Sequence, residues 1–344
     1  MQTGSTFVKM IALGAVLCGT ISLAARADDV ADFYKGKTIT VYTGVGMGSS
    51  YGTNALMFAN VFKTKIPGSP NVIAQAMPGA GGAKMVNYLY NAAPKDGTMI
   101  GFPLKYIAVN QALGQTGLKY DAAKFNYIGS LGPINSVIAM WAATTPAKTV
   151  DDARKKQAIM GSSGKSSETF ITPTLMNNLL GTKFKIVAGY TGTAPIHVAM
   201  ESGEVHGVAA SWDSVKGDKP DWVRNKKVIL LAQSGTKRNW DLQDLPTLLD
   251  LAKTPEQTDI LRFFANGNAV GWMMMLPPGV PQDRVAALRK AFDATMKDPG
   301  YLKGIKDRNL DIDPMTGAEV EKLIKETLSL PSQTMAKVKT AMGM

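Results

Sequence analysis

The sequence predicts an α/β protein of two similar lobes with a cleft between them. Strands and helices alternate along the chain, two blocks of such units follow one another, and extended segments near residues 135–143 and 266–276 connect the blocks. Alternation of this length is typical of doubly wound, parallel sheets with helices on both faces. The 344 residues are enough for two such domains.

The first block starts at residues 38–43, an apolar, alternating stretch that predicts a strand. Two further strands, at 71–77 and 97–102, alternate with helices at 54–65 and 83–93. We expect the loops after these strands to lie together at the carboxyl edge of the sheet, where open α/β sheets bind ligands.

The second block repeats the succession of strand, small polar loop and helix. Thr149, with Asp152 three residues later, predicts the start of its first helix, and Thr254 followed by Pro255 predicts the start of a later one. The segments 157–170, 184–193, 203–212 and 227–235 supply the second sheet.

The end of the chain is predicted to return to the first block. Residues 268–276 form a return strand, and helices follow at 281–296 and after Thr316. These elements divide the mature chain into one lobe of residues 28–136 with 270–344 and a second lobe of residues 137–269.

Residues 1–27 are typical of a signal peptide. Lys9 lies at the start of an apolar stretch, and Ala25 and Ala27 are small residues before the expected cleavage at Asp28. Cys18 is the one cysteine of the sequence, so the mature chain is expected to have no disulfide and no cysteine chemistry. Elsewhere no run approaches roughly 20 apolar residues, so we expect no membrane span.

Basic residues exceed acidic ones. Without residues 1–27, 36 Lys and Arg remain with 27 Asp and Glu, a net charge of +9. Such a surface favours anionic partners, although it also simply keeps an exported protein soluble. The sequence has no zinc-finger, RNP-type or basic-helix motif, so we expect no nucleic acid partner.

Two glycine-rich loops resemble nucleotide motifs only superficially. Residues 43–52, TGVGMGSSYG, fail the fingerprint G-x-G-x-x-G in both registers, since Ser49 or Tyr51 occupies the third glycine position. In GSSGKS, residues 161–166, two residues separate the glycines where a P-loop has four. We therefore expect no nucleotide cofactor.

Signals for catalysis are weak. Ser162 and Lys165 fit the spacing S-x-x-K, but the companion S-D-N and K-T-G elements are missing. Neither His197 nor His206 has a histidine partner at i+4, so we expect no metal site. A hydrolase that uses a serine of residues 161–168 remains an alternative.

A loop of glycine and serine that leads into a helix can bind an anion without any catalytic residue. It presents unpaired backbone N–H groups and the positive end of the helix dipole. Each dipole contact contributes only ~0.3–1 kcal/mol when exposed. Several such loops converging from two lobes can reach micromolar affinity, about −8 kcal/mol. The alternative is that the glycines only form tight turns.

Further motifs give the chain a resemblance to a known family. They are MPGAGG (77–82), NYLYNAAPKDGT (87–98), GYTGT (189–193), GEVHG (203–207) and LPPGVP (276–281). From about Phe33 to the last helices, the chain resembles the Bug family, the periplasmic solute-binding proteins of tripartite tricarboxylate transporters. The resemblance implies a Venus flytrap fold of the type II-like kind, with two doubly wound domains joined by a two-strand hinge.

The resemblance also implies which loops hold the ligand. It places at the site Gly48, Ser49, Ser50, Tyr51, Ala80, Gly81, Ser162, Ser163, Lys165, Ser166, Ser167, Tyr190, Thr191 and Thr193. Trp212 and Asp213 follow a predicted strand of the second lobe, where the indole would suit an aromatic acid by stacking. Core packing is the alternative for Trp212.

The first loop departs from the family pattern at its end. The family usually has an aspartate there, and this chain has Gly52. Loss of that carboxylate favours a more anionic ligand, as does Lys165 unless it is only a solvated loop lysine.

We therefore expect a periplasmic, monomeric receptor that is not an enzyme and needs no cofactor. It would bind a small mono-, di- or tricarboxylate, aromatic acids included, and deliver it to the permease subunits of a membrane transporter. Besides the serine hydrolase, a ligand sensor for a signalling partner remains an alternative.

Overall fold

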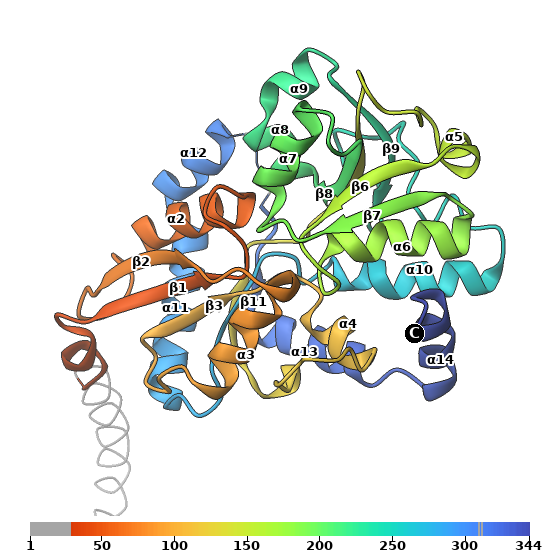
Figure 1. The fold of residues 1–344 in the computed structure, drawn as a ribbon. Coiled ribbons are helices and arrows are strands. Elements are labelled where there is room, and N and C mark those ends of the chain that lie inside the picture. Colours follow the sequence, from red (N-terminus) through yellow and green to blue (C-terminus); the bar gives the residue numbers. More distant parts are fainter. Residues whose placement is uncertain (1–28, 309, 311) are drawn as a thin grey trace, which may run out of the picture.

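Two β-sheets covered by helices make up the described part of the chain, residues 29–308, 310 and 312–344 of a computed structural model (Figure 1). The predicted signal peptide, residues 1–27, lies outside the described residues. Over the described ranges, no helix combines the length and apolar character needed to span a membrane.

The first sheet has six strands in the order β11-β4-β10-β3-β1-β2. β1 is parallel to β2 and β3, whereas β10 is antiparallel to β3 and β4. The sheet is therefore mixed and not parallel throughout, because β10 returns from the second half of the chain against its neighbours. The strands are β1 (Thr38–Thr43), β2 (Asn71–Ala76), β3 (Met99–Phe102), β4 (Asn126–Ser130), β10 (Met273–Leu276) and β11 (Met315–Thr316).

The second sheet has five strands in the order β7-β6-β8-β5-β9. β6 is parallel to β7 and β8, and β5 is antiparallel to β8 and β9, so this sheet is mixed as well. The strands are β5 (Ser136–Trp141), β6 (Ala158–Ser162), β7 (Phe184–Ala188), β8 (Gly207–Ser211) and β9 (Val228–Ser234).

Helices cover both faces of the first sheet. Buried residues of α2, α11 and α12 form a core with one face, and those of α3 and α13 form a core with the other. Successive residues of β10 point to opposite faces of the sheet. Met274 packs in the core with α2, α11 and α12, and Met273 and Met275 pack in the core with α3 and α13. The elements are α2 (Ser50–Phe62), η1 (Ala80–Gly82), α3 (Ala83–Asn91), α4 (Ile107–Ala112), η2 (Ala122–Lys124), α11 (Gln282–Met296), α12 (Pro299–Asp307) and α13 (Gly317–Leu328).

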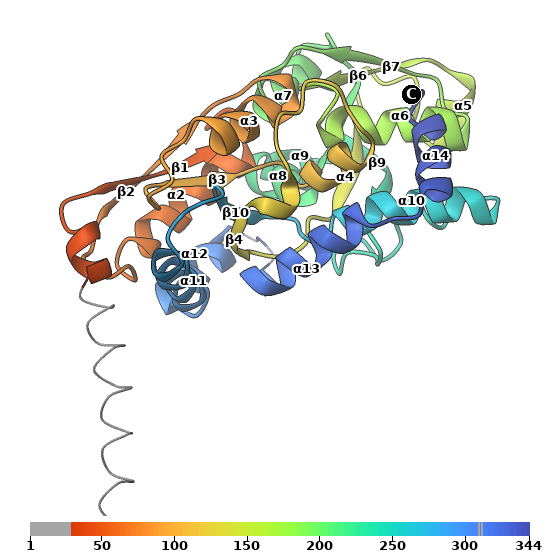
Figure 2. The same cartoon turned by 90° about the horizontal axis from the view of Figure 1, so that it is seen from below.

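The second sheet is likewise packed between helices. The last helix, α14, contacts α6 and α10 of this half, whereas α11 to α13 pack on the first sheet. Figures 1 and 2 both show α14 beside α10. The helices are α5 (Val150–Lys155), α6 (Glu168–Leu180), α7 (Thr193–Glu201), α8 (Trp212–Asp218), α9 (Pro220–Arg224), α10 (Pro255–Gly267) and α14 (Ser332–Ala341).

Two neighbouring segments, residues 131–135 and 268–272, connect the sheets. They are shorter than the predicted crossings, because the predicted ranges include β5 and β10, which belong to the sheets themselves. Leu131 N donates to Trp272 O (3.1 Å), and Ile134 N donates to Asn268 O (3.0 Å). Gly271 adopts φ +35°, and a Cβ there would lie 2.0 Å from the oxygen of Gly132, so the two segments approach too closely for a side chain.

Candidate ligand-binding site

Three helices begin at the junction of the two halves of the molecule. α2 follows β1 in the first half, and α6 and α7 follow β6 and β7 in the second. Each helix starts at the carboxyl end of its strand, after a short loop rich in glycine or serine that ends at Ser49, Ser167 or Gly192. The first N–H groups of a helix have no partner within the helix and carry its positive end. Among the described residues, the backbone nitrogens of Ser50 and Thr169 donate to no backbone oxygen outside their helices.

These helix starts border one cavity of about 50 Å³ between the two halves. Such a volume holds on the order of three water molecules. Both halves contribute to its wall, as does the connecting segment 131–135 through Ile134. The lining residues are Val45, Ser49, Ser50, Tyr51, Leu104, Lys105, Tyr106, Ile134, Ser163, Ser167, Glu168, Thr169, Gly192, Thr193, Ala209, Ala210 and Ser211.

The two halves are in direct contact beside this cavity. Gly46 N donates to Thr191 O (3.0 Å), and Asn110 Nδ2 donates to Ser166 O (2.9 Å). Gly81, at φ +63°, lies so close to the second half that a Cβ would be 2.9 Å from the backbone nitrogen of Ser166. The structure therefore has its two halves closed on each other.

The loop before α2 is built on a serine cap and a glycine. Ser49 Oγ donates to Gly46 O (2.7 Å) and accepts from Gly52 N (3.4 Å). A Cβ on Gly52 would lie 2.1 Å from the carbonyl oxygen of Met47. An aspartate at position 52 is thus incompatible with the backbone path of this loop.

The loop before α6 is held by a network of hydroxyl groups around Thr169. Its Oγ1 lies 2.5 Å from Ser167 Oγ and 3.2 Å from Ser162 Oγ, and it accepts a hydrogen bond from Ser163 N (2.9 Å). Ser167 Oγ also donates to Gly164 O (2.8 Å). These hydroxyl groups position the start of α6 against the cavity.

A buried ion pair crosses the cavity wall. Lys105, in the loop after β3, is 3% exposed, and its Nζ lies 2.6 Å from Glu168 Oε1 at the start of α6. Nζ also donates to Ser136 Oγ (2.8 Å). Burial lowers the pKa of Lys105, and the neighbouring Glu168 carboxylate opposes this shift. Burial raises the pKa of the Tyr51 hydroxyl, so this phenol stays neutral.

The structure brings part of the predicted site together. Six predicted residues line the cavity, namely Ser49, Ser50, Tyr51, Ser163, Ser167 and Thr193. The following predicted residues do not line it: Gly48, Ala80, Gly81, Ser162, Lys165, Ser166, Tyr190, Thr191, Trp212 and Asp213. Several of these residues, such as Gly81 and Ser166, instead form the contact between the two halves.

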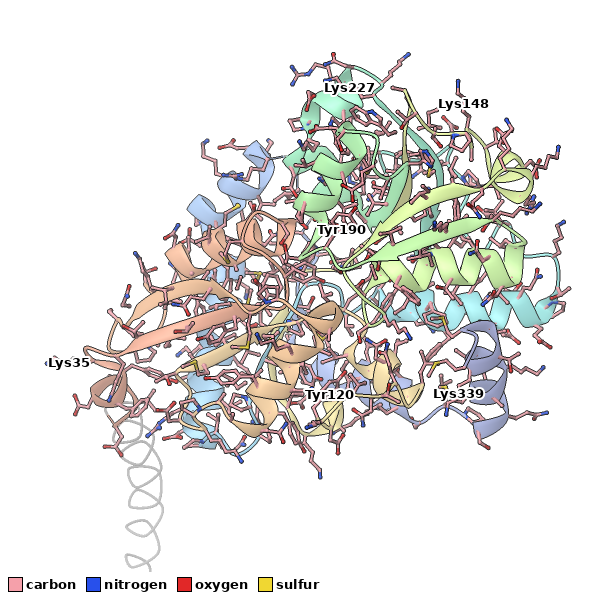
Figure 3. The ribbon with its side chains drawn as sticks, in the orientation of Figure 1. Lys35, Tyr120, Lys148, Tyr190, Lys227 and Lys339 are labelled. Atoms are coloured by element: carbon pink, nitrogen blue, oxygen red, sulfur yellow. The ribbon has the colours of Figure 1, made fainter. Side chains whose placement is uncertain are left out.

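Three other predicted groups, the side chains of Trp212, Lys165 and Tyr190, lie outside the cavity. Trp212 packs in a core with Val137 and donates from Nε1 to Asp241 Oδ2 (2.7 Å), so its indole forms no wall of the cavity. Lys165 is exposed, which fits the solvated alternative. The Tyr190 hydroxyl donates to Glu204 Oε1 (2.6 Å), and Figure 3 shows Tyr190 near the boundary between the two halves.

Sequence reasoning missed the charged residues of the cavity, Lys105 and Glu168. Lys105 had a signal, since it is a lone charge within the apolar run GFPLKYIAVN, residues 101–110. Glu168 had none, because an acidic residue in the first turn of a helix is ordinary. The pairing joins residues 63 positions apart and depends on how the halves meet.

Several exposed basic residues lie away from the cavity. Lys35, Lys148 and Lys227 are exposed at the outer ends of the molecule (Figure 3). Within the described ranges, no group of three or more His, Cys, Asp or Glu side chains is arranged to hold a metal ion.

Comparisons with known proteins agree with this architecture. Residues 63–339 match the family model described as tripartite tricarboxylate transporter family receptor. The periplasmic binding protein BugD is 18% identical, with a TM-score of 0.70 over 90% of this chain and 98% of that chain. An R. palustris protein with adipate is also 18% identical, with a TM-score of 0.70 over 88% and 97% of the two chains.

MatC from Rhodopseudomonas palustris with bound malate is 19% identical, with a TM-score of 0.68 over 88% of this chain and 99% of that chain. No curated protein sequence matches the chain. The structural similarities confirm the two-lobed α/β fold of periplasmic binding proteins. Because the family model covers most of its length, the chain belongs to the tripartite tricarboxylate transporter receptor family.

Proposed function

We propose that this protein captures a small organic carboxylate between its two lobes and delivers it to the permease subunits of a tripartite tricarboxylate-type transporter. The observation that carries the proposal is the convergence of three helix N-termini, from both lobes, on one cavity between the lobes. Two proteins of the same fold carry adipate and malate. A carboxylate is the ligand that unpaired N–H groups at helix starts favour.

The lobes in this proposal are residues 28–136 with 270–344 and residues 137–269. The distribution of the strands over the two sheets supports this division. Helix α14 belongs to the first lobe by residue number, but it contacts α6 and α10 of the second lobe. Closure follows from binding because the ligand touches both lobes only when they are together. We further propose that residues 1–27 are removed on export and that the mature receptor acts as a periplasmic monomer.

The contacts of the serines argue against a hydrolase. Ser163 and Ser167 bond to Thr169 and to backbone groups. His197 lies in a core beside Trp222, and its pKa is lowered to about 4, mainly by burial. Neither histidine lines the cavity, so no imidazole is placed to activate a serine there.

A thermal-shift screen with mono-, di- and tricarboxylates tests the proposal. A bound ligand at ~100 Kd stabilises the folded state by ~2.7 kcal/mol. Ser163→Glu places a bulky acid in the cavity wall and should abolish the shift. Lys165→Glu is the matched control, because it adds negative charge in the same loop but outside the cavity, and it should retain the shift. If no carboxylate stabilises the wild type, the proposal is wrong.

A further inference from the structure

The described residues place two charged side chains in the cavity wall, and these come from opposite lobes. Lys105 follows β3 in the first lobe, and Glu168 begins α6 in the second. Their 2.6 Å ion pair cancels the formal charge of the cavity. A buried pair of this kind is no reliable source of stability, so its presence at the ligand position calls for a functional explanation.

The pair leaves hydrogen-bonding capacity on both partners. An ammonium group has three protons, and the described residues offer Lys105 Nζ two oxygen acceptors, from Glu168 and Ser136. The hydrogen bonds found for the Glu168 carboxylate, from Lys105 and from Ser234 at 3.5 Å, both go to Oε1. Among the described residues, Oε2 therefore remains without a donor.

Whether Glu168 Oε2 and Lys105 Nζ form further hydrogen bonds depends on the chemical groups of the bound ligand. The Glu168 side chain is 13% exposed, and a ligand in the cavity would shield it from water. A plain carboxylate then leaves Oε2 unpaired and brings a second negative charge beside it, which costs binding free energy. A ligand with a hydroxyl or ammonium group near its carboxylate donates to Oε2 and places its own carboxylate toward Lys105 and the helix starts.

We propose that Glu168 selects carboxylates that also carry a hydrogen-bond donor, as hydroxy acids and amino acids do, over plain carboxylates of the same skeleton. Lys105 holds Glu168 in place and receives the ligand's carboxylate. This inference rests on the proposed function, because it specifies the ligand class of the same cavity.

Isothermal titration of matched ligands tests the selection. The carboxylate that binds most tightly in the screen is compared with analogues that differ from it at one substituent only. The first two sets each contain a plain acid, its hydroxy acid and its amino acid. They are propionate, lactate and alanine, and succinate, malate and aspartate. In the wild type, a donor-bearing ligand should bind at least about tenfold tighter than its plain analogue, the effect of one unpaired buried polar group.

Glu168→Gln keeps the size of the side chain and removes its charge. This variant should reduce the preference for donor-bearing ligands to less than about threefold. The reduction should be larger for ligands with an ammonium group than for ligands with a hydroxyl group. Glu168→Asp keeps the charge but withdraws it from the ligand, and it should reduce the preference in part. Glu256→Gln is the control, because Glu256 also lies in a first helical turn and pairs with a lysine, Lys337, but far from the cavity.

The outcomes separate this inference from the proposed function. If plain carboxylates bind the wild type as tightly as their donor-bearing analogues, or if Glu168→Gln keeps the full preference, the inference is wrong and the receptor proposal stands. If no carboxylate binds at all, both are wrong.

Discussion

The loops before α2 and α6 occupy equivalent places in the two lobes, yet they differ in charge. α2 has no acidic residue in its first turn, so the positive end of this helix is left for a ligand. α6 begins with Glu168, which is paired with Lys105 of the opposite lobe. In our proposal, one lobe offers a general anion site, and the other adds a charged group that discriminates between anions. Two strand–loop–helix units of the same kind thus differ at the first helical position, which is Ser50 in one and Glu168 in the other, and we propose that this difference confers specificity.

The largest expected effect comes from giving the first loop the aspartate that is usual in the family. In Gly52→Asp, the new Cβ would meet the Met47 carbonyl at 2.1 Å, so the loop has to move. We expect the folded state to lose roughly 3 kcal/mol and the ligand-induced thermal shift to disappear. Urea denaturation and the shift assay measure both effects.

Gly48→Ala serves as the control in the same loop. Its Cβ would lie 3.6 Å from Ala194 Cβ, an ordinary contact, so stability and binding should stay close to wild type. A Gly52→Asp protein that binds carboxylates normally would show that the first loop does not form the site.

Removing the acid of the second loop should have the next largest effect. Glu168→Ala leaves the Lys105 ammonium buried without its partner, which should cost about 3 kcal/mol at pH 7. Burial already lowers the pKa of Lys105 and Glu168 opposes this, so the variant lowers it further. Between this lowered pKa and the usual lysine pKa of ~10.4, Lys105 therefore binds fewer protons in the folded variant than in the unfolded chain.

The free energy of unfolding of the Glu168→Ala variant should consequently rise toward alkaline pH. The difference in this free energy between the variant and the wild type should shrink between pH 7 and 10. Urea denaturation at several pH values measures this. A deficit that stays constant or grows with pH would contradict a buried, unpaired ammonium at Lys105. The exposed pair of Glu256 and Lys337 is the reference, since Glu256→Gln should change stability by no more than ~0.5 kcal/mol.

The smallest expected effect concerns the helix cap of the first loop. Ser49→Ala removes the side chain that accepts from Gly52 N, which should cost about 1 kcal/mol and weaken ligand binding several-fold, because Ser49 also lines the cavity. Thr316→Ala removes a comparable cap from α13, away from the cavity, and should lose similar stability without any change in affinity. Equal ligand affinities in the two variants would exclude a direct role for Ser49.

Local patterns predicted much of the fold because their causes are local. Thr149, Thr254 and Thr316 cap helices as expected, since each hydroxyl accepts from a nitrogen three residues later. The mixed sheets were not predicted, because strand direction depends on where the chain returns. The three methionines of β10 show this limit, since their sequence indicates a buried strand but not its antiparallel neighbours.

The candidate site divides in the same way. The small polar loops before helices are visible in short stretches of sequence, and the resemblance to the family placed Ser49 and Ser167 of these loops at the site. Trp212 was expected as a possible wall of the cleft, and the structure places it in a core instead, where Val137 and Asp241 hold it. Adjacency to a predicted strand end does not decide the side to which a side chain points.

The sequence by itself determined the strand–loop–helix units, the helix caps and the unpaired N–H groups that they present, because these depend on residues a few positions apart. Only the tertiary structure decided that Lys105 and Glu168 meet, that Gly81 rests against Ser166, and that Trp212 is excluded from the cavity. Those relations arise between segments brought together by the two crossings, and the distance between such segments is a property of the packed lobes and not of any short stretch of chain.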